Sequence, residues 1–170
     1  MPPVPGNRPV IRPARAEDVP FLWEMLDHAA NWNTMRARSD VRTVPELSHY
    51  VEGWTPDQGG VVASLGGRDV GAAWLRYLPF TDPGYGYLEE DVPELTIGLD
   101  PVARGRGIGR ALLQALTDQA IERGVERVSL SVEPQNTTAM VLYLSEGFTR
   151  TGIVVGGSDI LVKRLRGAPS

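Results

Sequence analysis

Along the chain, hydrophobic residues alternate in places with the two-residue period of strands and in others with the three-to-four-residue period of helices. The first kind of pattern predicts about seven strands, at residues 10–14, 61–65, 70–78, 94–100, 127–132, 148–155 and 159–165. The second and third of these runs are joined by the turn-forming residues 66–69, which favour a hairpin. Residues 79–93 are rich in Pro, Gly, Tyr and acid, and they predict a long surface loop.

Helical spacing is clearest in the segment that follows Pro20, where acidic residues and a proline favour a helix start. The apolar face of this helix consists of Phe21, Leu22, Met25, Leu26 and Ala29. A weaker pattern predicts a short second helix after Pro45. Residues 107–123, closed by Gly124, and residues 137–146 predict two more helices. One mixed sheet with helices on both faces is the economical way to bury these elements.

Composition narrows the picture to a single domain of 170 residues, with 42% hydrophobic and 22% charged positions. We expect one domain at 10–165, with loose segments at 1–9 and 166–170. There is no apolar run of about 20 residues, as a membrane span needs, and no signal-like start, so we expect a soluble, cytoplasmic protein that does not bind a membrane. The net charge of −4 argues against broad capture of nucleic acid.

Cysteine is absent, which excludes disulfides, thiolate metal sites and a cysteine nucleophile. Only two histidines, His28 and His49, are present, and the carboxylates lack EF-hand spacing. We therefore predict no metal.

A glycine-rich turn separates the strand at 94–100 from the helix that begins at 107. Gly105, Gly107 and Gly109 allow backbone N–H groups to converge where a Cβ atom would block a ligand. These N–H groups and the positive end of the helix favour phosphate oxygens. The spacing matches neither the dinucleotide pattern G-x-G-x-x-G nor the mononucleotide loop ending in Lys and Ser or Thr. Nicotinamide and ATP are thereby disfavoured, whereas a turn that merely caps the helix stays an alternative.

The order of motifs resembles the GNAT superfamily of N-acetyltransferases. Its coenzyme A loop, Arg/Gln-x-x-Gly-x-Gly/Ala, is matched by Arg104, Gly107 and Gly109. A second signature, Asn-x-x-Ala-x-x-Leu-Tyr-x-x-x-Gly-Phe, is matched from Asn136 to Phe148. The resemblance implies an α/β fold of the α+β type: a mixed, mostly antiparallel sheet, splayed between the strands at 94–100 and 127–132. It also implies transfer of an acetyl group from acetyl-coenzyme A to a primary amine, by direct attack on the thioester in a ternary complex.

By this resemblance, the pantetheine arm binds the backbone of one strand and the pyrophosphate binds the glycine-rich loop. The implied cofactor-binding residues are Ile97, Gly98, Leu99, Arg104, Gly105, Arg106, Gly107, Ile108, Gly109, Arg110, Asn136 and Tyr143. Asn136 has the alternative role of a helix cap.

Two side chains are candidates for the chemistry of transfer. Tyr143 matches the family's tyrosine near the coenzyme sulfur, and we assign it as the general acid, with a packing role as the alternative. Glu94 begins the strand before the loop and is the candidate base, with an exposed strand-end glutamate as the alternative.

The acceptor site has no motif of its own. Candidate acceptor-binding residues are His28, Trp32, Tyr85, Tyr87, Glu89 and Glu90, with Asp91 beside them. Surface or core-edge packing and a solvated acidic loop are the alternative roles. The acceptor amine, small molecule or peptide, the acyl-chain length and a homodimer all stay open. A non-catalytic acyl-coenzyme A binding module and a nucleotide-binding regulator are the competing functions.

Overall fold

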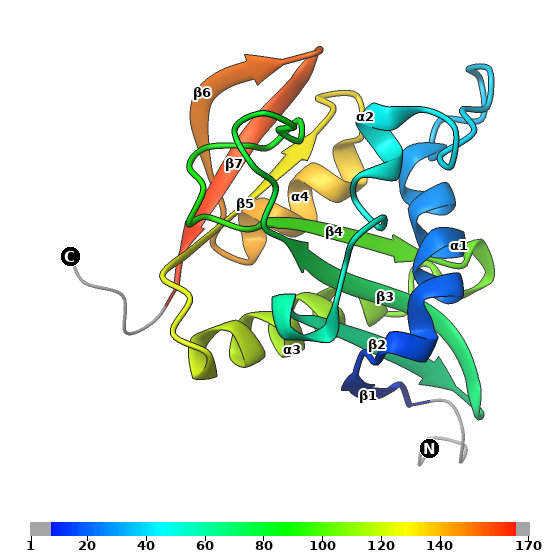
Figure 1. The fold of residues 1–170 in the computed structure, drawn as a ribbon. Helices are drawn as coiled ribbons and strands as arrows, with labels where there is room; N and C mark the ends of the chain where they lie inside the picture. The colour runs from blue at the N-terminus through cyan, green and yellow to red at the C-terminus, as the bar shows by residue number, and fades with distance from the viewer. Residues whose placement is uncertain (1–7, 166–170) are drawn as a thin grey trace.

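The computed structural model describes residues 8–165, so most of the predicted loose ends, 1–7 and 166–170, lie outside the described residues. Its central element is a seven-stranded sheet with the order β1-β2-β3-β4-β5-β7-β6 (Figure 1). The strands are β1 (Val10–Pro13), β2 (Gly60–Leu65), β3 (Arg68–Arg76), β4 (Glu94–Leu99), β5 (Arg127–Val132), β6 (Thr149–Val155) and β7 (Ser158–Arg164). Neighbouring strands pair antiparallel except β4 and β5, which are parallel. The predicted mixed, mostly antiparallel sheet is confirmed.

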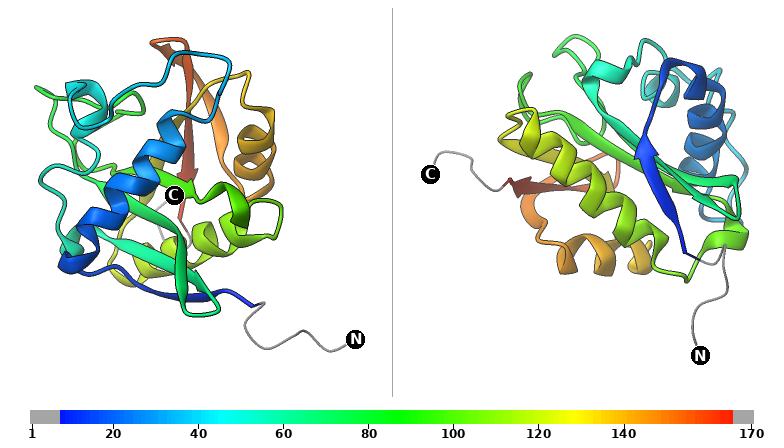
Figure 2. Two further views of the ribbon diagram at one scale, coloured as in Figure 1. Left: turned by 90° about the vertical axis from the view of Figure 1, so that its right-hand side faces the viewer. Right: turned by 90° about the horizontal axis from the view of Figure 1, so that it is seen from below.

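Helices cover both faces of this sheet, as Figure 2 shows from two directions. They are α1 (Val19–Ala30), α2 (Pro45–Ser48), α3 (Ile108–Glu122) and α4 (Thr137–Ser145). One apolar core lies between the sheet and the α1 side and includes Leu22, Met25 and Trp74. A second core lies on the α3 and α4 side and includes Leu112 and Leu116. The central strands of the sheet are therefore covered on both faces, whereas β6 at its edge is largely exposed.

Glycines with positive φ determine where several elements start and stop. Gly66 and Gly67 have φ values of 56° and 82°, the conformation that a two-residue hairpin turn requires at both positions. The turn therefore takes only these two residues, and β3 begins at Arg68, two residues before the predicted strand. Gly107 has a φ of 77° at the N-cap of α3, so this helix begins at Ile108.

The region after α1 differs most from its prediction. The expected second helix is a single turn, Pro45–Ser48, and Tyr50 and Val51 follow it in turns rather than in the helix. Both side chains are nevertheless buried in the core on the α1 side. Short 3₁₀ turns at Ala16–Asp18, Pro56–Gln58 and Pro101–Ala103 were not predicted.

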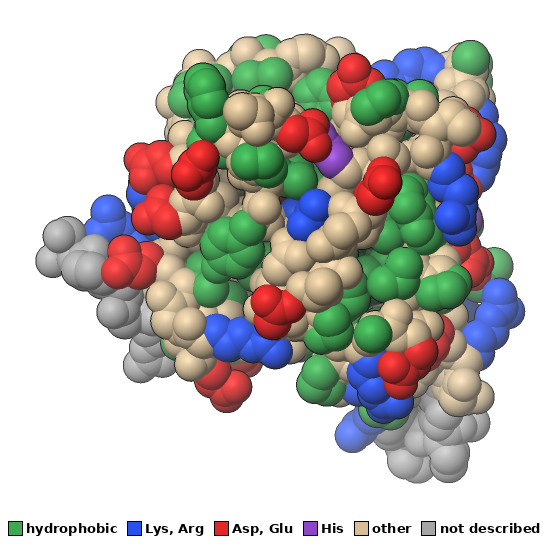
Figure 3. Space-filling view, viewed as in Figure 1, with side chains coloured by type: hydrophobic (Ala, Val, Ile, Leu, Met, Phe, Trp, Pro, Cys, Tyr) green, Lys and Arg blue, Asp and Glu red, His purple; other side chains and the backbone are tan. Residues whose placement is uncertain are grey.

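The surface carries charges of both signs. On the face in Figure 3, basic and acidic side chains are interspersed with apolar and polar ones. Among residues 8–165, no helix has both the length and the apolar character needed to cross a bilayer.

Candidate active site

The sheet opens between β4 and β5. These strands pair only at Glu94 and Ser129, next to a backbone hydrogen bond of 3.0 Å from the Ser129 N–H to the Pro93 carbonyl. On its other side β4 pairs with β3 along its whole length, from Glu94 to Leu99. Beyond Glu94, the β4 backbone groups that face β5 therefore lack a partner strand. This confirms the predicted splay between the two strands.

A cavity of about 970 Å³ occupies the opening and extends to the helices on both sides of it. Its lining includes the β4 residues Leu95, Thr96, Ile97, Gly98 and Leu99. At one end it reaches the glycine-rich loop, with Arg104, Gly105, Gly107, Ile108, Gly109 and Arg110. At the other end it reaches residues after α1 and the start of α4. A single cavity thus joins most of the predicted cofactor-binding residues to several of the predicted acceptor residues.

The glycine-rich loop borders this cavity at the start of α3. Gly105 and Gly107 have φ values of 76° and 77°, and a Cβ atom at either position would have no described heavy atom within 4 Å. The space in front of them is therefore open to a ligand, and it lies at the N-terminal end of α3, a helix of 15 residues. Arg104 lines the cavity, whereas Arg106 is exposed and is not among its described lining residues. Arg110 forms an ion pair with Glu146 on the surface.

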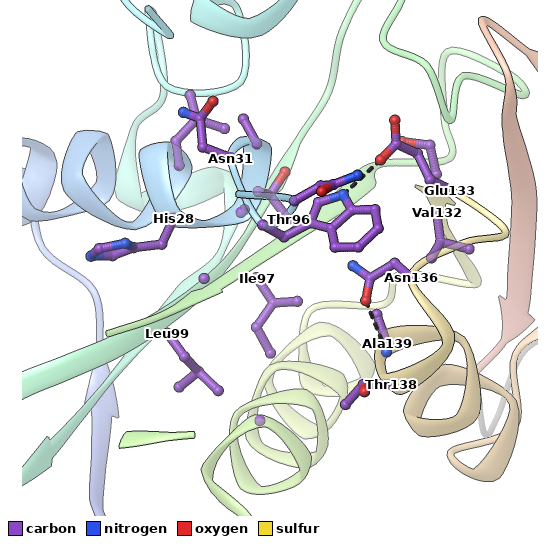
Figure 4. Close-up of a pocket in the computed structure, with 18 of the residues that line it drawn as sticks. His28, Asn31, Thr96, Ile97, Leu99, Val132, Glu133, Asn136, Thr138 and Ala139 are labelled. Carbon is purple, nitrogen blue, oxygen red and sulfur yellow. Dashed lines mark hydrogen bonds between the residues drawn. The ribbon is translucent and has the colours of Figure 1, made fainter. Parts of the chain in front are cut away.

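Residues of β4 alternate between the two faces of the sheet. A Cβ atom at Gly98 would lie 2.1 Å from the Met25 carbonyl oxygen, so glycine is needed there for α1 to pack against β4. Ile97 and Leu99 point toward α3, as Figure 4 shows. At Gly109 a Cβ atom would lie 3.6 Å from a Leu99 methyl carbon and 3.3 Å from a Leu142 methyl carbon. Gly98 and Gly109 therefore have packing roles in addition to any backbone contact with a cofactor.

Tyr143 lies in α4 and lines the cavity. Its ring packs edge-on against Phe148, with centroids 6.0 Å apart. Burial raises the pKa of Tyr143, and no hydrogen bond or charge from the described residues offsets this effect. The side chain is thus a neutral phenol with a proton to donate at neutral pH.

Asn136 precedes α4 and accepts a 3.4 Å hydrogen bond from the Ala139 N–H through its side-chain oxygen (Figure 4). The predicted capping role is therefore present. Asn136 also lines the cavity, and its amide NH₂ group stays a candidate donor for a cofactor.

Glu94 is 2% exposed, which excludes the alternative of a solvent-exposed glutamate at a strand end. Its carboxylate accepts hydrogen bonds from the N–H groups of Gly84 at 3.1 Å and Gly86 at 2.8 Å. It also accepts one from the Tyr50 hydroxyl at 3.2 Å. Burial raises the pKa of Glu94, and the hydrogen bonds lower it less than burial raises it.

The segment after α1 is bound to the end of β5. Trp32 donates an indole hydrogen bond of 2.6 Å to the Glu133 carboxylate (Figure 4). The Arg36 guanidinium donates two more, each of 2.8 Å, and lies 5.6 Å from the Trp32 ring centroid. We call Trp32, Arg36 and Glu133 the clasp. All three residues line the cavity, so the clasp closes one side of it.

Comparison with known proteins identifies this arrangement. The family model described as Acetyltransferase (GNAT) family matches residues 23–148, which include the loop, β4 and α4. The chain belongs to the GNAT acetyltransferase family. The GNAT resemblance inferred from the two sequence signatures is thereby confirmed.

Curated relatives of this GNAT chain include N-alpha-acetyltransferase RimI of Mycobacterium tuberculosis, 40% identical over 122 residues, covering 68% of this chain and 72% of the relative. Mycothiol acetyltransferase of Gordonia bronchialis is 32% identical over 151 residues, covering 80% of this chain and 49% of the relative. A second mycothiol acetyltransferase, from Rhodococcus erythropolis, is 30% identical, with 54% of its length covered. The chain thus spans about half the length of these mycothiol acetyltransferases.

Solved structures show the same fold. The yncA acetyltransferase of Salmonella typhimurium, described with its cofactor acetyl-CoA, has a TM-score of 0.65 at 22% identity, with 96% of this chain and 97% of that chain covered. The PaiA N-acetyltransferase of Thermoplasma acidophilum, in complex with coenzyme A, has a TM-score of 0.64 at 19% identity, with 92% and 99% covered.

The predicted acceptor residues of this GNAT chain are divided by the structure. His28, Trp32 and Tyr85 line the cavity. Tyr87, Glu89 and Glu90 are not among its described lining residues, and Glu89 pairs with Arg127 at 2.8 Å. These three residues lie in the loop between β3 and β4, outside the described cavity lining.

His28 belongs to a further group of polar side chains at the surface. Potential ligand atoms of Glu24, His28 and Asp100 lie within 4.8 Å of one another. The Asp100 carboxylate is already engaged by the Val102 N–H and by Arg68. Figure 4 shows the His28 imidazole pointing away from Glu133 and Asn136. The expected absence of a metal stays a prediction.

Sequence reasoning missed several residues at the junction of β4 and β5. Gly84 and Gly86 pass so close to Glu94 and β5 that a Cβ atom at Gly84 would lie 2.3 Å from the carboxylate, and one at Gly86 would lie 2.8 Å from the Leu130 carbonyl carbon. Ser129 donates a hydroxyl hydrogen bond of 2.6 Å to the Gly86 carbonyl. The Gly-Tyr-Gly sequence was the available signal, because two glycines around an aromatic residue favour a tightly packed turn.

Proposed function

We propose that this GNAT-family protein transfers an acetyl group from acetyl-coenzyme A to a primary amine by direct attack in a ternary complex. The observation that carries this proposal is the single cavity that joins the glycine-rich loop, Tyr143 and the clasp. A donor at the loop and an amine at the clasp would meet beside Tyr143. Holding both reactants in one cavity makes their reaction effectively unimolecular and removes the need for a covalent enzyme intermediate.

The loop residues fit the pyrophosphate of the donor. Open space in front of Gly105 and Gly107, the N-terminus of α3 and the positive charge of Arg104 all favour phosphate oxygens. The β4 backbone from Ile97 to Leu99 has unpaired groups toward β5 and would bind the amide-containing pantetheine arm as an added strand. Arg106 and Arg110 add charge at the outer edge of this site.

Tyr143 is the proposed general acid for the departing thiolate. Its buried phenol keeps its proton at neutral pH because burial disfavours the phenolate. Glu94 is the proposed base for the acceptor ammonium, and the raised pKa of its buried carboxyl brings it closer to the range in which a base works near neutrality.

The acceptor amine would lie at the end of the cavity that the clasp and Tyr85 border. The aromatic rings of Tyr50 and Tyr85, which line the cavity, suit a cationic amine. Relatives named for N-alpha-acetylation and for mycothiol acetylation point to peptide α-amines and small-molecule amines as the two classes to compare.

A turnover screen tests this function. The protein is incubated with acetyl-coenzyme A and a panel of peptide α-amines, lysine side-chain amines, polyamines and amino-sugar amines, and release of free thiol is measured. Amine-dependent thiol release is the expected result. Tight coenzyme A binding without release for any amine would instead favour a non-catalytic binding module, and a parallel series of longer acyl-coenzyme A donors measures chain-length preference.

A further inference from the structure

The proposed base cannot touch an acceptor in the cavity directly. Glu94 is 2% exposed and is not among the described residues that line the cavity. The backbone of Gly84 and Gly86 covers its carboxylate and donates two hydrogen bonds to it. A general base must lie within hydrogen-bond reach of the proton that it removes, directly or through one bridging group. Another group must therefore connect Glu94 to the cavity.

Tyr50 makes this connection. It lines the cavity, and its hydroxyl lies 3.2 Å from Glu94 Oε1. The same hydroxyl accepts a 2.8 Å hydrogen bond from the Tyr85 backbone N–H. Because an N–H can only donate and a carboxylate can only accept, the hydroxyl proton points to Glu94. The Ser131 hydroxyl is a further hydrogen-bond partner of Tyr50. The Tyr50 carbonyl is held in turn by a 2.8 Å hydrogen bond from the Trp74 indole.

We propose that Tyr50 is a further catalytic residue, which passes a proton from the acceptor ammonium to Glu94. This inference rests on the proposed acetyl transfer and assigns the route of its first proton. An N–H bond of the ammonium breaks as its proton binds the Tyr50 oxygen, while the Tyr50 O–H proton moves to Glu94 Oε1. Tyr50 ends as a neutral phenol, Glu94 as a carboxylic acid and the acceptor as a neutral amine.

The later steps balance this transfer. The amine lone pair attacks the thioester carbonyl, the new C–N bond forms, and the C–S bond breaks. The thiolate takes a proton from Tyr143, which a second amine proton replaces. Glu94 then returns its proton through Tyr50, in the reverse of the first transfer, to water in the cavity. Two protons thus leave the ammonium, one through Tyr50 and one to the coenzyme thiol.

The surroundings of the pair suit a relay. Burial and the nearby Glu94 charge raise the pKa of Tyr50 well above its ordinary value, so its resting state is the phenol. Two charged groups face Glu94. One is His49, whose positive form lowers the Glu94 pKa, and the other is Arg76, whose pKa the Glu94 charge raises. His49 is itself paired with Asp82 at 3.0 Å. Burial outweighs these effects, so Glu94 has a raised pKa.

Kinetics of Tyr50→Phe test the relay, with an N-terminal alanine peptide as acceptor. At pH 7 we expect kcat/KM for the peptide to fall about 100-fold, the usual contribution of acid–base catalysis. The loss should shrink above about pH 9, because a peptide α-amine with a pKa of about 8 is already neutral there. Tyr50→Phe and Glu94→Gln should give no larger loss together than singly, since they act in series. The proposal would be overturned if the two losses in kcat/KM multiplied in the double variant, or if the loss in Tyr50→Phe persisted above about pH 9.

A measurement without turnover separates this inference from the proposed function. Carboxyl ¹³C NMR titrates Glu94 in the wild type, in Tyr50→Phe and in the matched control Tyr77→Phe, whose side chain is 40% exposed and outside the described cavity lining. Loss of the Tyr50 hydrogen bond, which lowers the Glu94 pKa, should raise that pKa in Tyr50→Phe only. Thermal unfolding confirms that each variant is folded. An unchanged Glu94 pKa in folded Tyr50→Phe overturns the relay even if acetyl transfer is observed, whereas a panel without turnover overturns the proposed function.

Discussion

The two ends of the cavity are built in different ways. The glycine-rich end is one contiguous segment, residues 104–110, whose proposed binding groups are backbone N–H groups at the start of α3. The clasp end is assembled by side chains from distant segments, such as Trp32 with Glu133 and Tyr50 with Glu94. Backbone recognition tolerates changes in side chains as long as the backbone conformation is kept. Recognition by side chains can change with single substitutions, so under the proposed function acceptor preference varies at the clasp end.

Tyr143 lines the cavity that joins the two ends, and its removal should have the largest effect. Tyr143→Phe keeps the ring that packs on Phe148 but removes the proton donor. We expect kcat to fall about 100-fold while the Kd for coenzyme A changes little, because acid–base catalysis is lost and binding is not. Steady-state kinetics and calorimetric titration measure the two quantities. An unchanged kcat would remove Tyr143 from its assigned role.

Gly107→Ala tests whether the donor end depends on backbone conformation. Its φ of 77° disfavours a Cβ atom even though the space around it is open. We expect the Kd for coenzyme A to rise about ten-fold, equal to the 1–2 kcal/mol cost of the left-handed conformation in a non-glycine residue. Gly67→Ala is the matched control, since its φ of 82° and open surroundings are similar but it lies in the β2–β3 turn. Equal losses of coenzyme A affinity in both variants would contradict a specific role for the loop.

The contrast between the two ends also explains what could be predicted from the sequence. Both the loop at Gly107 and the start of α4 at Asn136 are local motifs, whose glycine and capping residues determine the backbone within a few positions. The splay between β4 and β5 was predicted from the resemblance to the GNAT superfamily, which these two motifs indicate. The hydrogen bonds of Glu94 could not be predicted, because they join residues 8, 10 and 44 positions apart across loops without periodicity.

The region after α1 shows the same limit. Tyr50 belongs to a hydrophobic pattern that predicts a helix. Its position depends instead on hydrogen bonds from the Trp74 indole and the Tyr85 N–H. The clasp joins Trp32 to Glu133 across 101 positions. Such contacts depend on the finished sheet, which places β5 opposite the end of α1, and a single sequence carries no local signal for them.

Arg104 should make a smaller, Coulombic contribution at the donor end. Arg104 and the neighbouring Arg106 are both exposed, but of the two only Arg104 is among the described residues that line the cavity. We expect Arg104→Gln to raise the Kd for coenzyme A about three-fold at low salt, and less at high salt, because exposed charges are screened. Arg106→Gln should have a weaker effect. Titrations with coenzyme A at two salt concentrations measure this effect. A loss of affinity in Arg104→Gln that does not depend on salt would indicate a packing role instead.

The clasp should give the smallest effect and act only on the acceptor end. Glu133→Gln weakens the hydrogen bonds from Arg36 and Trp32 while it preserves the shape of the side chain. We expect the KM for the acceptor to change by about two- to five-fold, in keeping with a partly exposed ion pair, and the Kd for coenzyme A to stay unchanged. Equal changes in both constants would show that the two ends are not independent.

The pH dependence of the clasp sharpens this test. The Arg36 hydrogen bonds lower the Glu133 pKa below its ordinary value of 4.5. A carboxyl with a lowered folded-state pKa stabilises the fold above its unfolded-state pKa, and this contribution is lost as the pH falls through the folded-state value. The difference in thermal unfolding between the wild type and Glu133→Gln should therefore be constant from pH 7 to about pH 5 and decline below the ordinary pKa of 4.5. A difference that does not decline as the pH falls below 4.5 would mean that the charge of Glu133 is not what stabilises the clasp.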